Sequence, residues 1–157
     1  MSSSRGLRTV ARGSAVAAVI VSTVGISAIP AQAAGPPSHV IENNSRCVDG
    51  DRWGKLYLSK CGSENPYQRF YREERGHYLL FGHSSSGKCL TGLGRDVDGV
   101  ELRPCNEHND QLWREDRAKH RLENFATGRC LDSKESVVYA RACDGSAGQR
   151  WTVLKII

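Results

Sequence analysis

The stretch CDGSAGQRW, Cys143 to Trp151, decides the fold because the chain contains it three times in recognisable form. The earlier copies read CNEHNDQLW, Cys105 to Trp113, and CGSENPYQRF, Cys61 to Phe70. In each copy a Gln lies two residues before a large aromatic residue and six or seven residues after a cysteine. Self-similarity at a fixed period indicates a fold built from repeated units.

A second shared stretch lies upstream of each copy. It combines apolar residues, a polar turn, a basic residue, a cysteine, an aliphatic residue and then Asp or Thr. The cysteines in these stretches, Cys47, Cys89 and Cys130, are 42 and 41 residues apart. Three units of about 41 residues therefore account for almost the whole chain after its N-terminal segment. The stretches are VIENNSRCVDG (Val40–Gly50), LLFGHSSSGKCLTG (Leu79–Gly92) and RLENFATGRCLDS (Arg121–Ser133).

The apolar residues within each unit alternate with polar ones. This pattern is clear in KLYLSKC (Lys55–Cys61), GVELRPC (Gly99–Cys105) and VVYARAC (Val137–Cys143). A period of two is typical of half-buried strands, and the Gly, Asn, Asp and Ser clusters between them favour turns. We expect an all-β fold with about four short strands per unit and pseudo-threefold symmetry. One unit cannot bury its apolar face, so the three must share a core.

Three copies of about 40 residues, with paired cysteines and a Q-x-W ending, resemble the ricin B-type lectin family, which has the β-trefoil fold. The resemblance runs from Val40 to Ile157, and the first unit has Phe70 where the others have Trp. It implies one disulfide inside each unit. The implied pairs are Cys47–Cys61, Cys89–Cys105 and Cys130–Cys143.

The N-terminal segment has the organisation of a secretory signal peptide. Arginines at positions 5, 8 and 12 precede an apolar stretch at 15–29, and Ala31-Gln32-Ala33 offers small residues for cleavage. The alternative is a retained membrane anchor, but the stretch is shorter than the roughly 20 residues a bilayer requires. We expect a signal peptide at 1–33, a flexible arm at 34–38, a trefoil domain at 39–157, and a secreted mature protein.

Charge and cysteine usage restrict the partners. The leader carries three arginines and no acidic residue, so its removal lowers the formal charge from +5 to +2. No run of like charge remains, which argues against nucleic acid as a partner, and no membrane span is expected after cleavage. Six cysteines in an exported chain indicate disulfides, and no zinc-ligand spacing is present. We therefore predict no metal and no cofactor.

The Q-x-W ending has a structural interpretation. On an extended segment residues i and i+2 share a face, so the Gln and the aromatic residue point the same way. The aromatic ring fills the core, and the Gln amide satisfies backbone groups that would otherwise be buried unpaired. The residues concerned are Gln68 and Phe70, Gln111 and Trp113, and Gln149 and Trp151.

In ricin-type lectins each sugar pocket has three recurring parts. An Asp follows the first cysteine by two residues, an aromatic residue precedes the second by two, and an Asn precedes the Gln. The carboxylate grips sugar hydroxyls while the ring covers the C–H face. No unit keeps all three. The first position holds Asp49, Thr91 and Asp132; the second holds Ser59, Arg103 and Arg141; the third holds Tyr67, Asp110 and Gly148.

Other aromatic residues offer substitutes for the missing ring. Tyr57 and Tyr139 lie four residues before their second cysteines, on the strand face of the missing aromatic, and Trp53 lies in a polar loop. Each also has a structural interpretation, as packing between strands or as cover for one end of the barrel. Asp49 and Asp132 are equally compatible with capping a turn.

Arginines near two of these positions suggest acidic glycans as ligands. Arg141 with Asp132, and Arg103 with Asp110, would place a guanidinium in a sugar pocket, where it can hold a carboxylate in a bidentate contact. The alternative is that these arginines form ordinary surface ion pairs. The candidate sugar-binding residues are Asp132, Tyr139, Arg141, Asp49, Tyr57, Trp53 and Asp110.

Three functions compete on this evidence. The first is a secreted carbohydrate-binding module without catalysis. The second is a trefoil that has lost sugar binding and recognises a protein surface, as an inhibitor or a toxin accessory subunit. An enzyme is the third: no known catalytic motif is visible, and the neighbouring acids Asp96, Asp98 and Glu101 are expected to be solvated.

Overall fold

The computed structural model describes residues 38–156, which form strands and short 3-10 turns. The signal peptide expected at 1–33 and residues 34–37 of the expected arm lie outside this range. Ser38, which was assigned to the arm, is instead the first residue of strand β1. Within the described range no helix has the length and apolar character needed to cross a bilayer.

Six strands form a barrel. Antiparallel pairing joins β12 to β1, β1 to β4, β4 to β5, β5 to β8 and β8 to β9. The ring closes where the Trp151 N–H, beside β12, donates to the His120 carbonyl, beside β9. The barrel strands are β1 (Ser38–Asn43), β4 (Phe70–Arg75), β5 (Tyr78–His83), β8 (Leu112–Asp116), β9 (Arg121–Asn124) and β12 (Thr152–Lys155).

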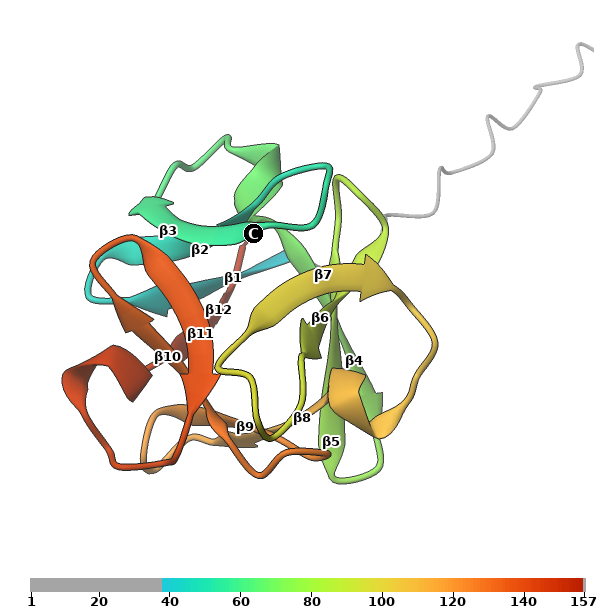
Figure 1. Cartoon of the computed structure of the whole chain (residues 1–157). Coiled ribbons are helices and arrows are strands. Elements are labelled where there is room, and N and C mark those ends of the chain that lie inside the picture. The colour runs from blue at the N-terminus through green and yellow to red at the C-terminus, as the bar shows by residue number, and fades with distance from the viewer. Residues whose placement is uncertain (1–37, 157) are drawn as a thin grey trace, which may run out of the picture. The chain divides into compact units, whose positions relative to one another are not determined.

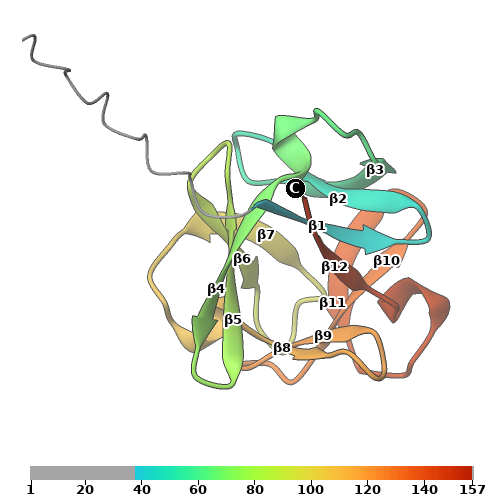
Figure 2. The ribbon, with the colours of Figure 1, turned by 180° about the vertical axis from the view of Figure 1, so that it is seen from behind.

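Three hairpins complete the fold, one from each unit. Figures 1 and 2 show them arranged around a common centre. In each, five residues pair with five on the partner strand in the same antiparallel register. The all-β trefoil with pseudo-threefold symmetry is thus confirmed. The hairpins are β2 (Arg46–Gly50) with β3 (Leu56–Lys60), β6 (Lys88–Gly92) with β7 (Val100–Pro104), and β10 (Cys130–Lys134) with β11 (Val137–Arg141).

We refer to the three units by their strands: the first unit contains β1 to β4, the second β5 to β8 and the third β9 to β12. In each unit a 3-10 turn carries the Gln of the Q-x-W ending and leads into the last strand. These turns are η1 (Pro66–Gln68), η2 (Asn109–Gln111) and η3 (Ala147–Gln149).

Equivalent residues of the three units meet in one core. The aliphatic residue after each first cysteine is fully buried, as are Phe70 and Trp113, and Trp151 is 3% exposed. The indole N–H of Trp113 donates to the Leu90 carbonyl at 2.9 Å, and that of Trp151 donates to the Leu131 carbonyl at 2.7 Å. The aromatic residue of each ending therefore fills the core, and in the second and third units its indole also ties the last strand to the hairpin.

The cysteines pair within units, as the family resemblance implied. Their Cα atoms are 5.0 Å apart in all three disulfides, an ordinary separation for this bond. Each disulfide joins the start of a hairpin to the segment just after it. The pairs are Cys47–Cys61, Cys89–Cys105 and Cys130–Cys143.

Candidate functional site

The Gln of each Q-x-W ending organises the loop where a family pocket would lie. In the third unit Gln149 Nε2 donates to the Ala142 carbonyl at 2.8 Å and to Asp132 Oδ2 at 3.0 Å. Its Oε1 accepts from the Asp144 N–H at 3.0 Å. Gln68 and Gln111 make the equivalent bonds in their own units. The Gln thus bridges the backbone on both sides of the second cysteine.

The residue two places after the first cysteine of each unit takes part in this bridge. Asp49 and Asp132 accept from the Gln amide and are only 4% and 3% exposed. Thr91, which replaces the Asp in the second unit, makes the same contact through Oγ1 at 3.1 Å and is fully buried. A hydroxyl performs this task as a carboxylate does, so the position supports the fold in all three units.

In the third unit η3 packs closely against Asp132, one of the candidate pocket residues. A Cβ on Gly148 would lie 2.2 Å from Asp132 Oδ1 and 2.3 Å from the Ser133 carbonyl oxygen, so only glycine allows η3 this close to β10. Asp132 Oδ1 accepts from the Ser133 N–H. Beside it, the Arg141 guanidinium lies 4.8 Å from the Tyr139 ring centroid. Tyr139 and Arg141 are neighbours, but the Asp132 carboxylate faces inward.

In the second unit two charged residues form ion pairs, one within the unit and one with the third unit. Arg103 forms an ion pair with Glu101, and Asp98 forms one with Arg129. The carbonyl of Asp110 accepts from the Asn124 side chain at 2.7 Å. Arg103 is therefore part of an ion pair, which is the alternative that the sequence left open. Its partner is Glu101 and not Asp110.

The first unit has an open hollow of about 220 Å³ on its surface. Its lining contains three aromatic side chains together with Asp51 and Arg52. Trp53 is 73% exposed and Tyr67 is 49% exposed, so both rings are available to a ligand. The hollow brings together Trp53 and Tyr57, two of the predicted site residues. The aromatic lining residues are Trp53, Tyr57 and Tyr67.

Hydrogen bonds shape the loop that carries Trp53. Asp51 Oδ1 accepts from the N–H groups of Trp53, Gly54 and Lys55 at 2.8–2.9 Å. Desolvation raises the pKa of Asp51, but these three backbone donors lower it more, and the pKa is below its ordinary value. Three donors on one oxygen fold residues 51–55 into a compact turn that points the indole outward.

The tyrosine next to this loop is held neutral. Burial raises the pKa of Tyr57, and the nearby Asp49 carboxylate raises it further by disfavouring a second negative charge. Tyr67 is supported from the second unit, where His83 Nε2 donates to its carbonyl at 2.9 Å. Because a carbonyl only accepts, this bond places the proton on Nε2 and leaves Nδ1 to accept from the Ser86 hydroxyl.

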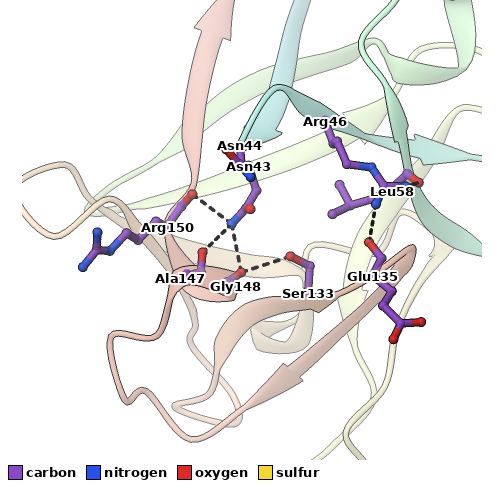
Figure 3. A pocket seen from close by; sticks show the side chains of 9 residues that line it. All are labelled: Asn43, Asn44, Arg46, Leu58, Ser133, Glu135, Ala147, Gly148 and Arg150. Atoms are coloured by element: carbon purple, nitrogen blue, oxygen red, sulfur yellow. Dashed lines mark hydrogen bonds between the residues drawn. The ribbon is translucent and has the colours of Figure 1, made fainter.

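A larger hollow of about 600 Å³ lies between the first and third units (Figure 3). Its polar groups are already joined across the unit boundary. Asn43 Nδ2 donates to the carbonyls of Ala147, Gly148 and Arg150, and the Arg46 guanidinium donates to two further carbonyls. The side chain of Arg150 points away from this hollow in Figure 3. The polar groups of this hollow therefore serve to hold the first and third units together.

Three residues at the first-unit hollow were not among the predicted site residues. Asp51 and Arg52 precede the predicted Trp53, and Tyr67 occupies the position of the family Asn. A signal existed for the loop, because DGDRWGK combines turn formers with a tryptophan that no strand requires. For Tyr67, in η1, the signal was its place at the third pocket position of the family.

Comparison with known proteins places this geometry in a family. The model of the ricin-type β-trefoil lectin domain matches residues 77–155, the second and third units. The hemolysin of Vibrio cholerae serotype O1 is 31% identical over 88 residues, covering 56% of this chain and 11% of that protein. N-acetylgalactosaminyltransferase 7 of Rattus norvegicus is 28% identical over 116 residues, covering 70% of this chain and 17% of that protein.

A solved structure shows the same fold. The designed threefold-symmetric protein ThreeFoil superposes with a TM-score of 0.66 at 18% identity, covering 74% of this chain and 97% of ThreeFoil. The matches span only a small part of the length of the two natural relatives. Repeat pattern, disulfides, fold and sequence match agree, and the chain belongs to the ricin-type β-trefoil lectin domain family.

Proposed function

We propose that this protein is a secreted, non-catalytic glycan-binding module and that the first-unit hollow is its sugar site. The observation that carries the proposal is the hollow itself, where Trp53, Tyr57 and Tyr67 line one open surface beside a carboxylate. Its volume of about 220 Å³ is below the roughly 300 Å³ at which enclosed small-molecule pockets begin, which suits one sugar ring resting on the surface.

The chemistry of the lining fits a sugar. An aromatic face covers the C–H patch of a pyranose ring, and the exposed indole of Trp53 is the largest such face in the hollow. Asp51 uses Oδ1 for the turn, which leaves Oδ2 to accept from sugar hydroxyls. A carboxylate kept ionised by backbone donors is a strong acceptor for such hydroxyls.

The positive charge of Arg52 at the hollow favours acidic glycans as ligands. The guanidinium of Arg52 lies 4.3 Å from the Trp53 ring centroid, and Arg52 has no ion pair within residues 38–156. An acidic sugar stacked on Trp53 would bring its carboxylate to this charge. Arg52 therefore takes the role that the sequence suggested for Arg103 and Arg141.

A glycan array that includes acidic glycans, followed by calorimetry on the best ligand, tests the proposal. Trp53→Ala should weaken binding about tenfold, because the stacking face is removed. Phe125→Ala is the matched control, since Phe125 is an exposed aromatic residue (44% exposed) that stacks on Tyr78 outside the hollow. Equal affinity of the Trp53→Ala variant and the unmodified protein would place the site elsewhere.

Protein recognition is the second candidate, and the third unit favours it. Asp132 is 3% exposed with Gly148 packed against it, and no unit keeps all three parts of the family's sugar pocket. A folded protein that is silent on every glycan would support this alternative. Secretion is tested separately, by N-terminal sequencing of the exported protein, which should begin at Ala34.

A further inference from the structure

The basic residue before each first cysteine reaches the hairpin loop of the preceding unit. Lys88 Nζ, in the second unit, donates to the Arg52 and Trp53 carbonyls of the first unit, both at 3.1 Å. Arg129, in the third unit, contacts Asp98 Oδ1 of the second unit. The cycle closes with Arg46, which donates to the third-unit Glu135 carbonyl at 2.6 Å (Figure 3).

A backbone hydrogen bond accompanies each of these contacts. The N–H group three residues before each second cysteine donates to a carbonyl of the same preceding loop. The three bonds are Leu102 to Gly54 at 2.7 Å, Ala140 to Asp98 at 3.4 Å and Leu58 to Ser136 at 2.9 Å. Each hairpin loop is thus held by the next unit around the pseudo-threefold axis.

For the first unit the loop held in this way carries Trp53. Lys88 engages the carbonyls of Arg52 and Trp53, while Asp51 engages the N–H groups of the same turn. Gly54 fits tightly against the second unit, because a Cβ there would lie 2.4 Å from the Leu102 carbonyl oxygen. The two peptide groups that flank Trp53 are therefore bound at both ends. Asp51 of the same unit accepts from their N–H groups, and Lys88 of the second unit donates to their carbonyls.

We propose that Lys88 is a positioning residue that holds the Trp53 loop in the orientation that forms the first-unit hollow. The inference rests on the proposed sugar site and deepens it, because the second unit becomes part of that site without touching the ligand. An ammonium group that donates to two adjacent carbonyls restricts rotation of the peptide between them. The backbone that carries the Trp53 side chain, which is 73% exposed, then keeps one conformation.

The test compares Lys88→Met with Arg129→Met. Arg129 contacts the second-unit loop through the Asp98 carboxylate, and that loop carries no tryptophan, so each variant removes a contact between a basic residue and the hairpin loop of the preceding unit. Lys88→Met should weaken binding of the best array glycan about three- to tenfold, and Arg129→Met should leave it unchanged. Lys88→Arg keeps the donors and should restore the affinity. Denaturant titration of each variant verifies folding.

A second readout does not depend on any glycan. The chain has three tryptophans, and Trp113 and Trp151 are 0% and 3% exposed, so local nanosecond motion in time-resolved fluorescence anisotropy reports Trp53. Lys88→Met should increase this motion, and Arg129→Met should not. The inference is overturned if Lys88→Met leaves the motion unchanged or if Arg129→Met increases it equally. If the unmodified protein binds no glycan, the proposed function fails, while the anisotropy still decides the role of Lys88.

Discussion

At the scale of single residues, the Gln of each Q-x-W ending forms hydrogen bonds through both its amide nitrogen and its amide oxygen. Gln149 is 1% exposed and bonds to backbone groups on both sides of Cys143 as well as to Asp132. Because the same bonds recur in units whose other site residues differ, the conserved task of this residue is to hold the loop. Sugar binding, where present, uses the side chains around it.

Gln149→Ala should therefore lower the free energy of unfolding by about 3 kcal/mol. The change removes a side chain that is 1% exposed and leaves the Asp132 carboxylate, which is 3% exposed, without its amide donor. Guanidinium titration followed by circular dichroism measures the loss. Asn109→Ala removes an exposed amide from the neighbouring unit and should change stability by less than about 0.5 kcal/mol. Similar values for the two variants would contradict the structural role of the Gln.

At the scale of elements, each hairpin is a closed loop with its own cross-link. The three disulfides span 14, 16 and 13 residues, and each closes one hairpin of its own unit. In the chain-entropy model a loop of about 15 residues contributes about 3 kcal/mol by restricting the unfolded chain. A small domain with a total stability of roughly 5–15 kcal/mol depends strongly on three such loops.

Replacing both cysteines of one pair by Ala should cost about 3 kcal/mol, with similar values for the three pairs because the loop lengths are similar. Denaturant titration of the three double variants measures this. A cost confined to one pair would show that strain or local packing, rather than loop closure, governs the contribution of these bonds.

At the scale of the whole molecule, the three units share one backbone scaffold but differ in their surface side chains. The hollow of the first unit has three aromatic residues, η3 packs against Asp132 in the third unit, and Arg103 of the second unit is paired with Glu101. A single shallow site binds weakly, so display of several copies on one surface would raise the avidity.

We accordingly expect one glycan per chain. Calorimetry with a monovalent ligand should give a stoichiometry of one, and Trp53→Ala should reduce the heat of that single event. A stoichiometry of two or three would mean that Tyr139 and Arg141, or the second unit, form sites that open when ligand is present.

Much of the fold was predictable because its determinants are local and repeated. The spacing of cysteines, Gln and aromatic residues recurs three times, and period-two alternation places the hairpin strands. The pattern of residue types in one unit therefore predicts the strands and turns of the other two. The disulfide pairing followed from the family resemblance, and the pairs Cys47–Cys61, Cys89–Cys105 and Cys130–Cys143 are present.

The candidate site was predictable only in part. Tyr57 stood out because it lies on the strand face of the missing aromatic residue, and Trp53 because it lies in a polar loop, and both line the hollow. Asp132 also matched the family pattern, but its carboxylate is turned inward because Gly148 allows η3 to pack against it. A pattern of residue types does not show whether a side chain faces solvent.

The sequence by itself determined the triplicated β architecture, since strand alternation and cross-link spacing act over a few residues. Only the tertiary structure decided which unit keeps an open aromatic surface. That surface combines Trp53 from a hairpin loop, Tyr67 from η1 and support by Lys88 from the second unit. Trp53 and Tyr67 are brought together by the folding of the first unit, and Lys88 by the packing of the second unit against it, and the spacing of these residues in the sequence does not show which loop each side chain reaches.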